Sequence, residues 1–440
     1  MNLTVGSSAD DGNRFPLLAS RTINGRSLIL VVAAGSIITS IGLGTRATFG
    51  LFLTPVTETL GTGRGMFGLA IAIQNIIWGL SQPIAGAIAD RFGAAKTLAV
   101  GGIGYGLALL VISTATGSGV FYLSAGVMVG LATGAASFSI VLASVGRMAP
   151  PEKASMALGV VTAMGSVGQF LLIPVAGSLI DEYGWRTAFV VLAAVVASIA
   201  LFVPFLRGRA IDQQGELAST SHGEATPLRH ELRRAVHSRA YLLLNMAFFV
   251  CGFHVTFIAT HFVAYGGDVG ISESIARTGL MLIGLFNIAG SLTAGYLGGR
   301  RPKTQLLSAI YLARAVVLTA FVLVPVSEIT ILAFGATFGL LWLSTVPLTG
   351  GIVAGLFGTT HSGTLFGFVF LSHQMGAFLG AFFGGVIADR VGSYEPVWWI
   401  AVALGLFAAV VHQFIDESPA SQPPPARNPS TGLAAAATGG

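Results

Sequence analysis

Long apolar segments separated by short polar breaks recur along the whole chain. A helix that crosses a bilayer needs about 20 mostly apolar residues, and the sequence contains twelve segments of this kind. They lie at residues 28–56, 66–88, 97–115, 119–145, 156–180, 187–206, 240–264, 275–298, 304–326, 328–355, 363–387 and 396–415. The pattern predicts an all-α membrane protein with twelve transmembrane helices.

One polar break is much longer than the others and falls near the middle of the chain. Residues 207–239 are rich in Ser, Glu and Arg, and they separate six apolar segments from six. The stretch after Ser418 contains consecutive prolines and ends in an Ala/Gly run, which is typical of disorder. We therefore expect five parts: an N-terminal tail (1–26), a six-helix bundle (27–206), a cytoplasmic linker (207–239), a second six-helix bundle (240–415) and a disordered tail (416–440).

Composition agrees with a membrane protein. The 440 residues are 53% hydrophobic and 9% charged, with a mean hydropathy of +0.80, whereas a soluble domain carries roughly 25% charged residues. The single cysteine, Cys251, allows neither an intramolecular disulfide nor a Cys-based metal cluster. The N-terminus is polar and the first apolar run is long enough to stay in the membrane, so we expect no cleavable signal peptide.

The net charge of +5 would suggest nucleic-acid binding in a soluble protein, but here its distribution indicates topology. Seventeen of the 23 Lys and Arg residues lie on the side of the predicted membrane that holds both termini; the four on the other side are Arg64, Arg186, Arg277 and Arg390. Positive charge gathers on the cytoplasmic side. We therefore expect both termini in the cytoplasm, a location in the inner membrane, and no nucleic-acid partner.

The two halves of the chain repeat each other. At an offset of 208 residues, six positions match, and at an offset of 209, Gly86 and Arg91 match Gly295 and Arg300. The first set pairs Gly159, Gly168, Phe170, Gly177, Asp181 and Gly184 with Gly367, Gly376, Phe378, Gly385, Asp389 and Gly392. Transporters built from such repeats bind substrate near the midplane and rock one bundle against the other.

A motif after the second predicted helix resembles one of a known family. The run Gly86-Ala-Ile-Ala-Asp-Arg-Phe-Gly93 is similar to the loop 2–3 motif of the major facilitator superfamily, in the order Gly86, Asp90, Arg91, Gly93. It departs at Ala94 and Ala95, where the family usually has basic residues. The second-half copy keeps glycine and Arg300 but has Gly299 in place of the aspartate. We take these residues as gating and motif positions.

Within that superfamily, the chain looks most like bacterial members of the monocarboxylate-porter branch. The similar runs are Lys153-Ala-Ser-Met-Ala-Leu-Gly159, Gly44-Thr-Arg-Ala-Thr-Phe-Gly50 and Phe370-Leu-Ser-His-Gln-Met-Gly376. The resemblance implies the major facilitator fold, a central cavity and alternating access by a monomer. It also implies that helix 1 lines the cavity while helix 9 packs outside the core.

Two arginines lie deep in predicted helices, and no Asp or Glu does. They are Arg46 and Arg314. A buried charge costs about 2.5–3.5 kcal/mol on insertion scales, so it is normally functional and partnered. A guanidinium matches a carboxylate bidentately, so we expect Arg46 to anchor an anionic substrate. A structural arginine that binds backbone carbonyls is the alternative, and it is the favoured interpretation for Arg314, the second intramembrane charge.

Three histidines are the deep side chains that titrate near neutrality. They are His254 and His261 in helix 7 and His373, next to Gln374, in helix 11. Each is a candidate for proton coupling, and the alternative for each is a hydrogen-bonded core residue. Exchange of anions, or movement of the proton with the anion, would need no such group.

Polar residues on the helices expected to line the cavity complete the candidate site. Beyond Arg46, His373 and Gln374, the substrate-binding candidates are Thr45, Ser137, Gln169, Asn287, Trp342 and Thr345. Helix 2 carries Gln74, Asn75 and Trp78 at helical spacing, where amides can bond a neighbouring helix or line a cavity. Arg277, near the start of helix 8, is expected to face the outer water.

The sequence contains no motif that indicates another chemistry. The sequence has no Gly-x-x-x-x-Gly-Lys-Ser/Thr phosphate loop, no metal-ligand spacing and no nucleophile elbow, so we expect no enzyme, metal or cofactor. The leading hypothesis is a secondary transporter of a small carboxylate, with H+ symport or exchange. An exporter of amphipathic compounds and a non-transporting membrane sensor are the alternatives.

Overall fold

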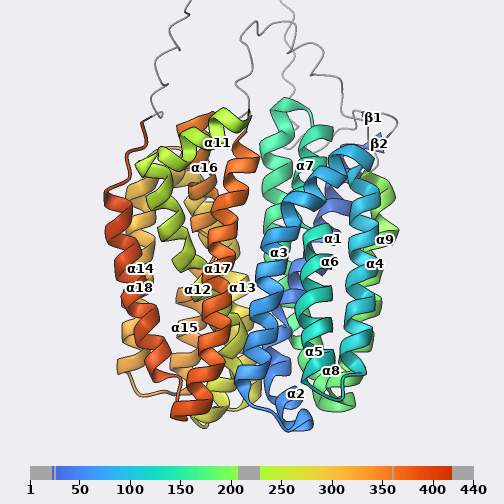
Figure 1. Ribbon diagram of the computed structural model, residues 1–440, viewed down its shortest axis with the longest axis vertical. Coiled ribbons are helices and arrows are strands. Elements are labelled where there is room, and N and C mark those ends of the chain that lie inside the picture. The colour runs from blue at the N-terminus through green and yellow to red at the C-terminus, as the bar shows by residue number, and fades with distance from the viewer. Residues whose placement is uncertain (1–21, 24–25, 207–227, 359–360, 419–440) are drawn as a thin grey trace, which may run out of the picture.

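A computed structural model describes residues 22–23, 26–206, 228–358 and 361–418, and these residues are almost entirely helical (Figure 1). Most of both expected tails and residues 207–227 of the expected linker lie outside this part of the chain. The exception to the helices is a pair of short antiparallel strands, β1 (Thr22–Ile23) and β2 (Arg26–Ser27), with Thr22 opposite Ser27.

The first half contains the helices before residue 207. They are α1 (Leu28–Ala47), η1 (Phe49–Phe52), α2 (Leu53–Leu60), α3 (Arg64–Phe92), α4 (Ala94–Ser113), α5 (Ser118–Phe121), η2 (Tyr122–Met128), α6 (Val129–Ala135), α7 (Phe138–Met148), α8 (Pro151–Ala197), α9 (Ile199–Phe202) and η3 (Val203–Leu206).

The second half contains the helices after residue 227. They are α11 (Leu228–His237), α12 (Arg239–Asp268), α13 (Glu273–Gly298), α14 (Lys303–Leu323), α15 (Glu328–Leu341), α16 (Thr345–Phe357), α17 (Ser362–Val391) and α18 (Glu395–Gln413).

Eleven apolar helical runs in the described residues are long enough to cross a membrane. One of them, Met156–Leu206, is 51 residues long and contains Gly184 at φ 78° and ψ 163°. A positive φ suits glycine because it has no Cβ, and this residue separates two spans within the run. The expected fold of twelve transmembrane helices is therefore confirmed.

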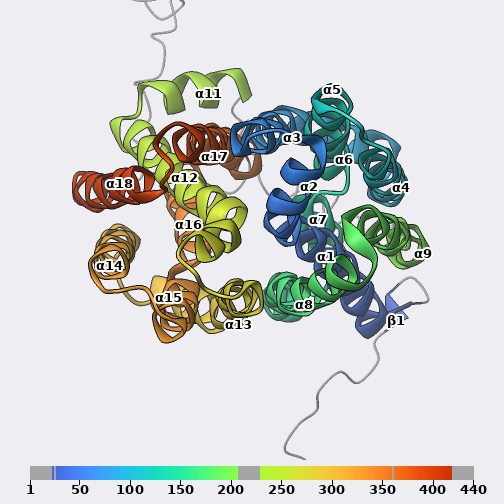
Figure 2. The ribbon, with the colours of Figure 1, turned by 90° about the horizontal axis from the view of Figure 1, so that it is seen from below.

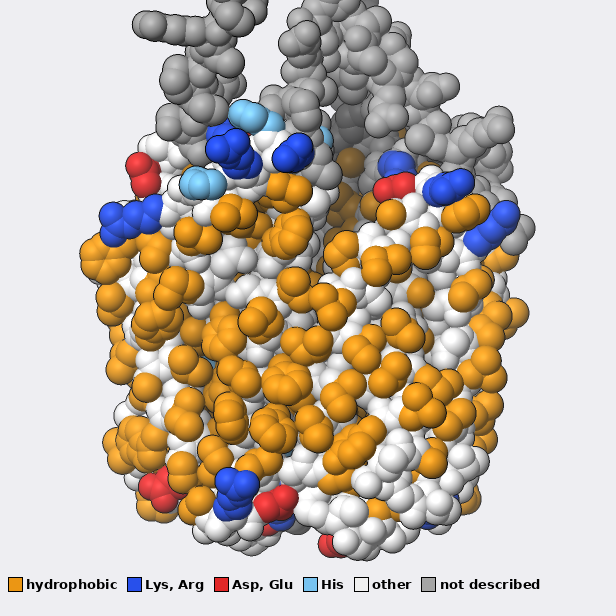
Figure 3. All heavy atoms as spheres, viewed as in Figure 1, with side chains coloured by type: hydrophobic (Ala, Val, Ile, Leu, Met, Phe, Trp, Pro, Cys, Tyr) orange, Lys and Arg blue, Asp and Glu red, His pale blue; other side chains and the backbone are white. Residues whose placement is uncertain are grey.

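The spans form two bundles that stand side by side (Figure 2). We call the end where α1 begins and α11 lies the linker end, and the end where α2 finishes at Leu60 the distal end (Figure 1). Gly68 of α3 lies against the backbone of Ala381 in α17, so these two helices meet closely across the halves. Figure 3 shows apolar side chains around the middle of the molecule and charged ones at its two ends, as a bilayer requires.

Two interrupted spans of the described residues correspond to each other under the repeat. The fourth span breaks at Ala136–Ser137 between α6 and α7, where Ser137 is extended (φ −69°, ψ 143°). The tenth span breaks at Trp342–Ser344 between α15 and α16. An offset of 208 carries position 137 to position 345. Discontinuous spans near the midplane are where transporters of repeated architecture place their binding sites.

Candidate functional site

Arg46 lies in the last turn of α1, where the first span changes from α1 to η1. Its Nη2 donates a hydrogen bond to Oδ1 of Asn75, 2.5 Å away, and its Cζ lies 4.7 Å from the ring centroid of Trp78. Asn75 is held in turn, because its Nδ2 donates to the carbonyl of Ile71. The partners of Arg46 on α3 are thus a neutral amide and an aromatic face, and Nε has no hydrogen-bond partner among the described residues.

A cleft lies beside Trp78, at the break in the fourth span. We call it the fourth-span cleft, and its lining includes no Asp, Glu, Lys or Arg from the described residues. The lining residues are Ile38, Thr39, Gly42, Leu43, Trp78, Tyr105, Thr133, Ala136, Ser137, Phe138 and Val141. Ser137 also caps α7, since its hydroxyl accepts from the N–H of Ile140. Of the predicted residues, Ser137 therefore lies in this cleft, and Thr45 is buried in α1 one residue before Arg46.

The break in the tenth span is filled by side chains of the protein itself. Arg314 of α14 is fully buried; its Nη2 donates to the carbonyls of Leu341 at 2.7 Å and Trp342 at 2.5 Å. On the other side, the N–H of Leu343 donates to Oδ1 of Asn287 at 2.9 Å. These contacts favour a structural role for Arg314 and draw Asn287 and Trp342 into the same network.

The remaining polar candidates line the contact between the halves or lie inside the second half. Nε2 of Gln169 donates to the carbonyl of Leu280 across the halves, and Nδ2 of Asn287 donates to the hydroxyl of Ser166 at 2.8 Å. Thr345 contacts Cys251, with 3.3 Å between hydroxyl and sulfur.

The three histidines differ in position. His373 stacks on Phe370 with 5.5 Å between ring centroids, and Phe370 packs edge-on against Trp78 at 5.2 Å. His373 is thereby joined to the Arg46 region across the halves. The other two are enclosed in the second half: Nε2 of His254 lies 2.8 Å from the carbonyl of Ala401, and Nε2 of His261 lies 2.9 Å from that of Ala381.

The loop motif lies at the linker end. Asp90 pairs with Arg147 of α7 at 3.3 Å, within the first half, and both side chains are largely exposed. Gly93 has a φ of 98°, which explains the glycine there. Arg91 packs over the ring of Phe92, and the second-half Arg300 packs over Tyr296 at 3.6 Å.

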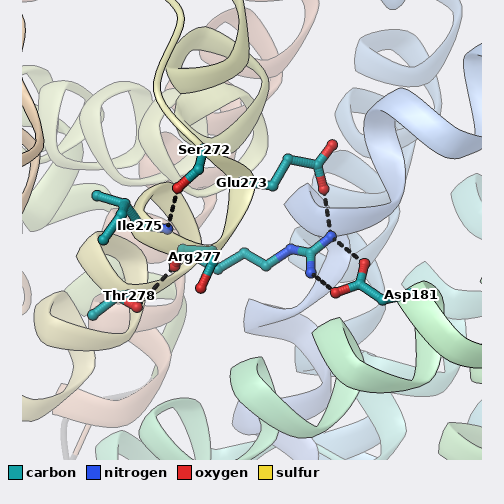
Figure 4. A network of polar contacts seen from close by, with 7 residues as sticks. Asp181, Ser272, Glu273, Ile275, Arg277 and Thr278 are labelled. Atoms are coloured by element: carbon teal, nitrogen blue, oxygen red, sulfur yellow. Dashed lines mark hydrogen bonds and ion pairs between the residues drawn. The ribbon is translucent and has the colours of Figure 1, made fainter.

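At the distal end, ion pairs and hydrogen bonds join the two halves. Arg277 of α13 donates to both carboxylate oxygens of Asp181 in α8, at 2.6 and 2.9 Å, and it also pairs with Glu273 (Figure 4). Arg277 is buried, so the expectation that it faces the outer water is wrong. The carboxylate partner in the other half, which is distant in sequence, allows its burial.

A second aspartate also joins the two halves at the distal end. Asp389 of α17 accepts from the backbone N–H groups of Arg64 at 2.9 Å and Gly65 at 2.7 Å, which begin α3. The Arg64 side chain pairs with Asp268. Asp181 and Asp389 are equivalent under the repeat of 208 residues. We call the contacts of these two aspartates the distal clasps.

Sequence reasoning did not identify Asn75 as the partner of Arg46, nor the distal clasps. The helical spacing of Asn75 and Trp78 was the available signal for the first. The repeat itself was the signal for the second, because it matches Asp181 with Asp389.

Twelve apolar helices in two bundles, with polar side chains gathered where the halves meet, define a membrane protein of the transporter class. The model of the Major Facilitator Superfamily matches residues 32–349. The chain belongs to this superfamily, which is a family of transporters and not an enzyme class.

Several relatives are similar over most of their length. An uncharacterized MFS-type transporter of Bacillus subtilis (strain 168), YcxA, is 25% identical over 394 residues, covering 87% of this chain and 94% of the relative. Monocarboxylate transporter 12 of Mus musculus is 24% identical, covering 76% and 74%. Monocarboxylate transporter 13 of Bos taurus is 24% identical, covering 90% and 92%.

A solved structure supports the fold. The crystal structure of a D-xylose-proton symporter superposes with a TM-score of 0.72 at 14% sequence identity, covering 89% of this chain and 98% of that one. At this identity the likeness establishes the architecture alone.

Proposed function

We propose that the protein is a secondary transporter of a small organic monocarboxylate in the inner membrane, working with H+ or by anion exchange. The observation that carries the proposal is the state of Arg46. One arm of its guanidinium is fixed by Asn75, its face lies on Trp78, and Nε is free to donate. A carboxylate substrate would neutralise the charge with a bidentate pair of hydrogen bonds.

The relatives support the same substrate class. Two of them carry the name monocarboxylate transporter, and each is similar to this chain over at least 74% of its own length. A single guanidinium beside an aromatic face and apolar walls also suits an anion with one charge and an uncharged tail.

Alternating access accounts for the distal clasps. They hold the halves together at the distal end, whereas the ion pairs Arg147–Asp90 and Lys303–Glu417 at the linker end each join residues of one half. The excess of Lys and Arg at the linker end supports a cytoplasmic location for this end. We take this arrangement as a state closed toward the outside, in which substrate reaches Arg46 from the cytoplasm.

Two routes of coupling stay open in this proposal. His373 is the best placed histidine for proton coupling, because its ring joins the aromatic contacts that lead to Trp78. Exchange of one anion for another needs no titrating group, because the substrate itself neutralises Arg46.

The test is uptake of labelled lactate, pyruvate and a dicarboxylate into proteoliposomes. Stimulation by an alkaline interior indicates symport, and stimulation by preloaded anion alone indicates exchange. We expect Arg46→Ala and Arg46→Lys to lose uptake while still inserting, because the bidentate anchor is lost. Arg301→Gln, which changes an exposed arginine at the linker end, is the control. Uptake retained by Arg46→Ala would refute the anchoring role.

A further inference from the structure

The fourth-span cleft contains three buried hydrogen-bond donors that have no acceptor. Thr39, Trp78 and Tyr105 line it, and the donors are the hydroxyls of Thr39 and Tyr105 and the indole N–H of Trp78. Their residues are 2%, 1% and 9% exposed, and these polar atoms have no hydrogen-bond partner among the described residues. A buried donor without an acceptor costs about 1–3 kcal/mol. Three such donors from α1, α3 and α4 around one cleft therefore indicate a site built for an acceptor.

Further positive potential surrounds the same space. The cleft includes Ser137 and Phe138, where α7 begins, and the N-terminus of a helix favours an anion. Arg46 lies over the ring of Trp78, one of the residues that line the cleft. The described walls hold no acidic side chain, so a cationic group would find no partner there.

At the break in the tenth span, the equivalent space in the second half is filled by a side chain of the protein. There α14 supplies Arg314, whose guanidinium donates to the carbonyls of Leu341 and Trp342 at the break. In the first half, α4 supplies Tyr105, whose neutral hydroxyl donates to no described group. The protein closes the tenth-span break with its own charge and leaves the fourth-span break open.

We propose that the fourth-span cleft is the subsite for the substrate's carboxylate and that Tyr105 is a substrate-binding residue. This inference rests on the proposed function. A carboxylate offers about four lone-pair positions. The Tyr105 hydroxyl and the Trp78 N–H supply donors within the cleft, and Arg46, which lies over the Trp78 ring, supplies further donors from beside it. The head of the acid then lies in the first half, and its uncharged tail points toward Phe370 of α17. A second carboxylate on the tail would meet an aromatic ring, so dicarboxylates are disfavoured.

The experiment compares Tyr105→Phe with Tyr311→Phe in proteoliposomes. Both tyrosines are fully buried and both hydroxyls lack a partner in the described residues, but Tyr311 lies beside Arg314 at the closed break. We expect Tyr105→Phe to raise KM for lactate about tenfold or more, because a hydrogen bond to a charged group is lost, with Vmax unchanged. Tyr311→Phe keeps the wild-type KM.

Three readouts separate binding from a structural effect. The factor in KM must be the same for lactate and for a monocarboxylate with a longer tail, since the head is common to both. Thr39→Val, which keeps the side-chain shape, must raise KM in the same direction, and this variant serves if Tyr105→Phe fails to fold. An unchanged KM would overturn the proposal, whether or not Vmax falls. It would mean that water satisfies the hydroxyl.

The failures of the two proposals are distinguishable. If the wild-type protein takes up monocarboxylates and Arg46→Ala does not, while Tyr105→Phe and Thr39→Val both match wild type, the subsite is overturned and the proposed function stands. If the wild-type protein takes up none of the acids, both are overturned.

Discussion

The breaks in the fourth and tenth spans occupy equivalent places in the two halves, yet their surroundings differ. At the tenth span, Arg314 and Asn287 bind the freed backbone groups on both sides. At the fourth span, Ser137 caps α7 and the neighbouring cleft keeps donors without acceptors. A repeated architecture can thus assign structure to one half and binding to the other. Under the proposed function, the same type of charged side chain serves both roles, and its hydrogen-bond partners distinguish them.

The strongest test of this difference between the two breaks replaces Arg314 and Arg46 in turn. Arg314→Met leaves the carbonyls of Leu341 and Trp342 without their donor, and each charge-assisted bond is worth about 1.5–3 kcal/mol. We expect the midpoint of thermal unfolding in detergent to fall by about 5–10 °C. Arg46→Met, the matched variant, removes a cation that lacks a carboxylate partner and should leave the midpoint nearly unchanged. Equal losses of stability in both variants would contradict the division of roles.

The histidines of the second half allow a smaller test. His373 stacks on Phe370, which meets Trp78 of the first half, whereas His254 is enclosed in the second half and bonds the carbonyl of Ala401. If His373 relays the proton, His373→Gln should exchange lactate normally but lose the accumulation of up to about tenfold that one pH unit can drive. His254→Gln is the matched variant and should keep pH-driven uptake if its role is structural. Normal accumulation by His373→Gln would exclude it as the relay.

Variants of the distal clasps are expected to give the smallest effect. The clasps contrast with the breaks, because both halves use the equivalent aspartate for the same purpose. Asp181→Ala and Asp389→Ala each remove one partly exposed carboxylate. The contacts of such a carboxylate contribute about 0.5–1 kcal/mol to holding the halves together. We expect each to raise the labelling rate of a cysteine placed at Val386, beside Gly65, about two- to fivefold with a polar maleimide. Glu182→Ala, an exposed acid next to Asp181, should leave the rate unchanged. If only one clasp variant responds, the clasps are not equivalent.

The sequence predicts the helices well because each span is a local property. Twenty apolar residues identify a span whatever its neighbours are, and each of the twelve expected segments is largely helical in the structure. Arg46 could be singled out on the same basis, since charge inside an apolar run is visible without tertiary information.

Contacts between distant residues could not be predicted in this way. Arg277 was expected in water because its carboxylate partner, Asp181, is 96 residues away in the other half. The break in the fourth span was also hidden, because Gly134, Ala135, Ala136 and Ser137 read as a small, apolar continuation of a helix. The cleft at that break depends on α1, α3 and α4 meeting there, which no local pattern encodes.

The clasp at Asp389 is made on one side by main-chain N–H groups, and this has a consequence for tolerance to mutation. Every residue except proline supplies an N–H, so most substitutions at position 64 leave its donor in place. Position 65 is more restricted, because a Cβ there would lie 3.1 Å from Oδ2 of Asp389. The aspartate has no such substitute. Random mutagenesis should therefore find this contact nearly insensitive to side-chain chemistry at position 64 and sensitive to it at position 389, although the two partners share the same hydrogen bonds.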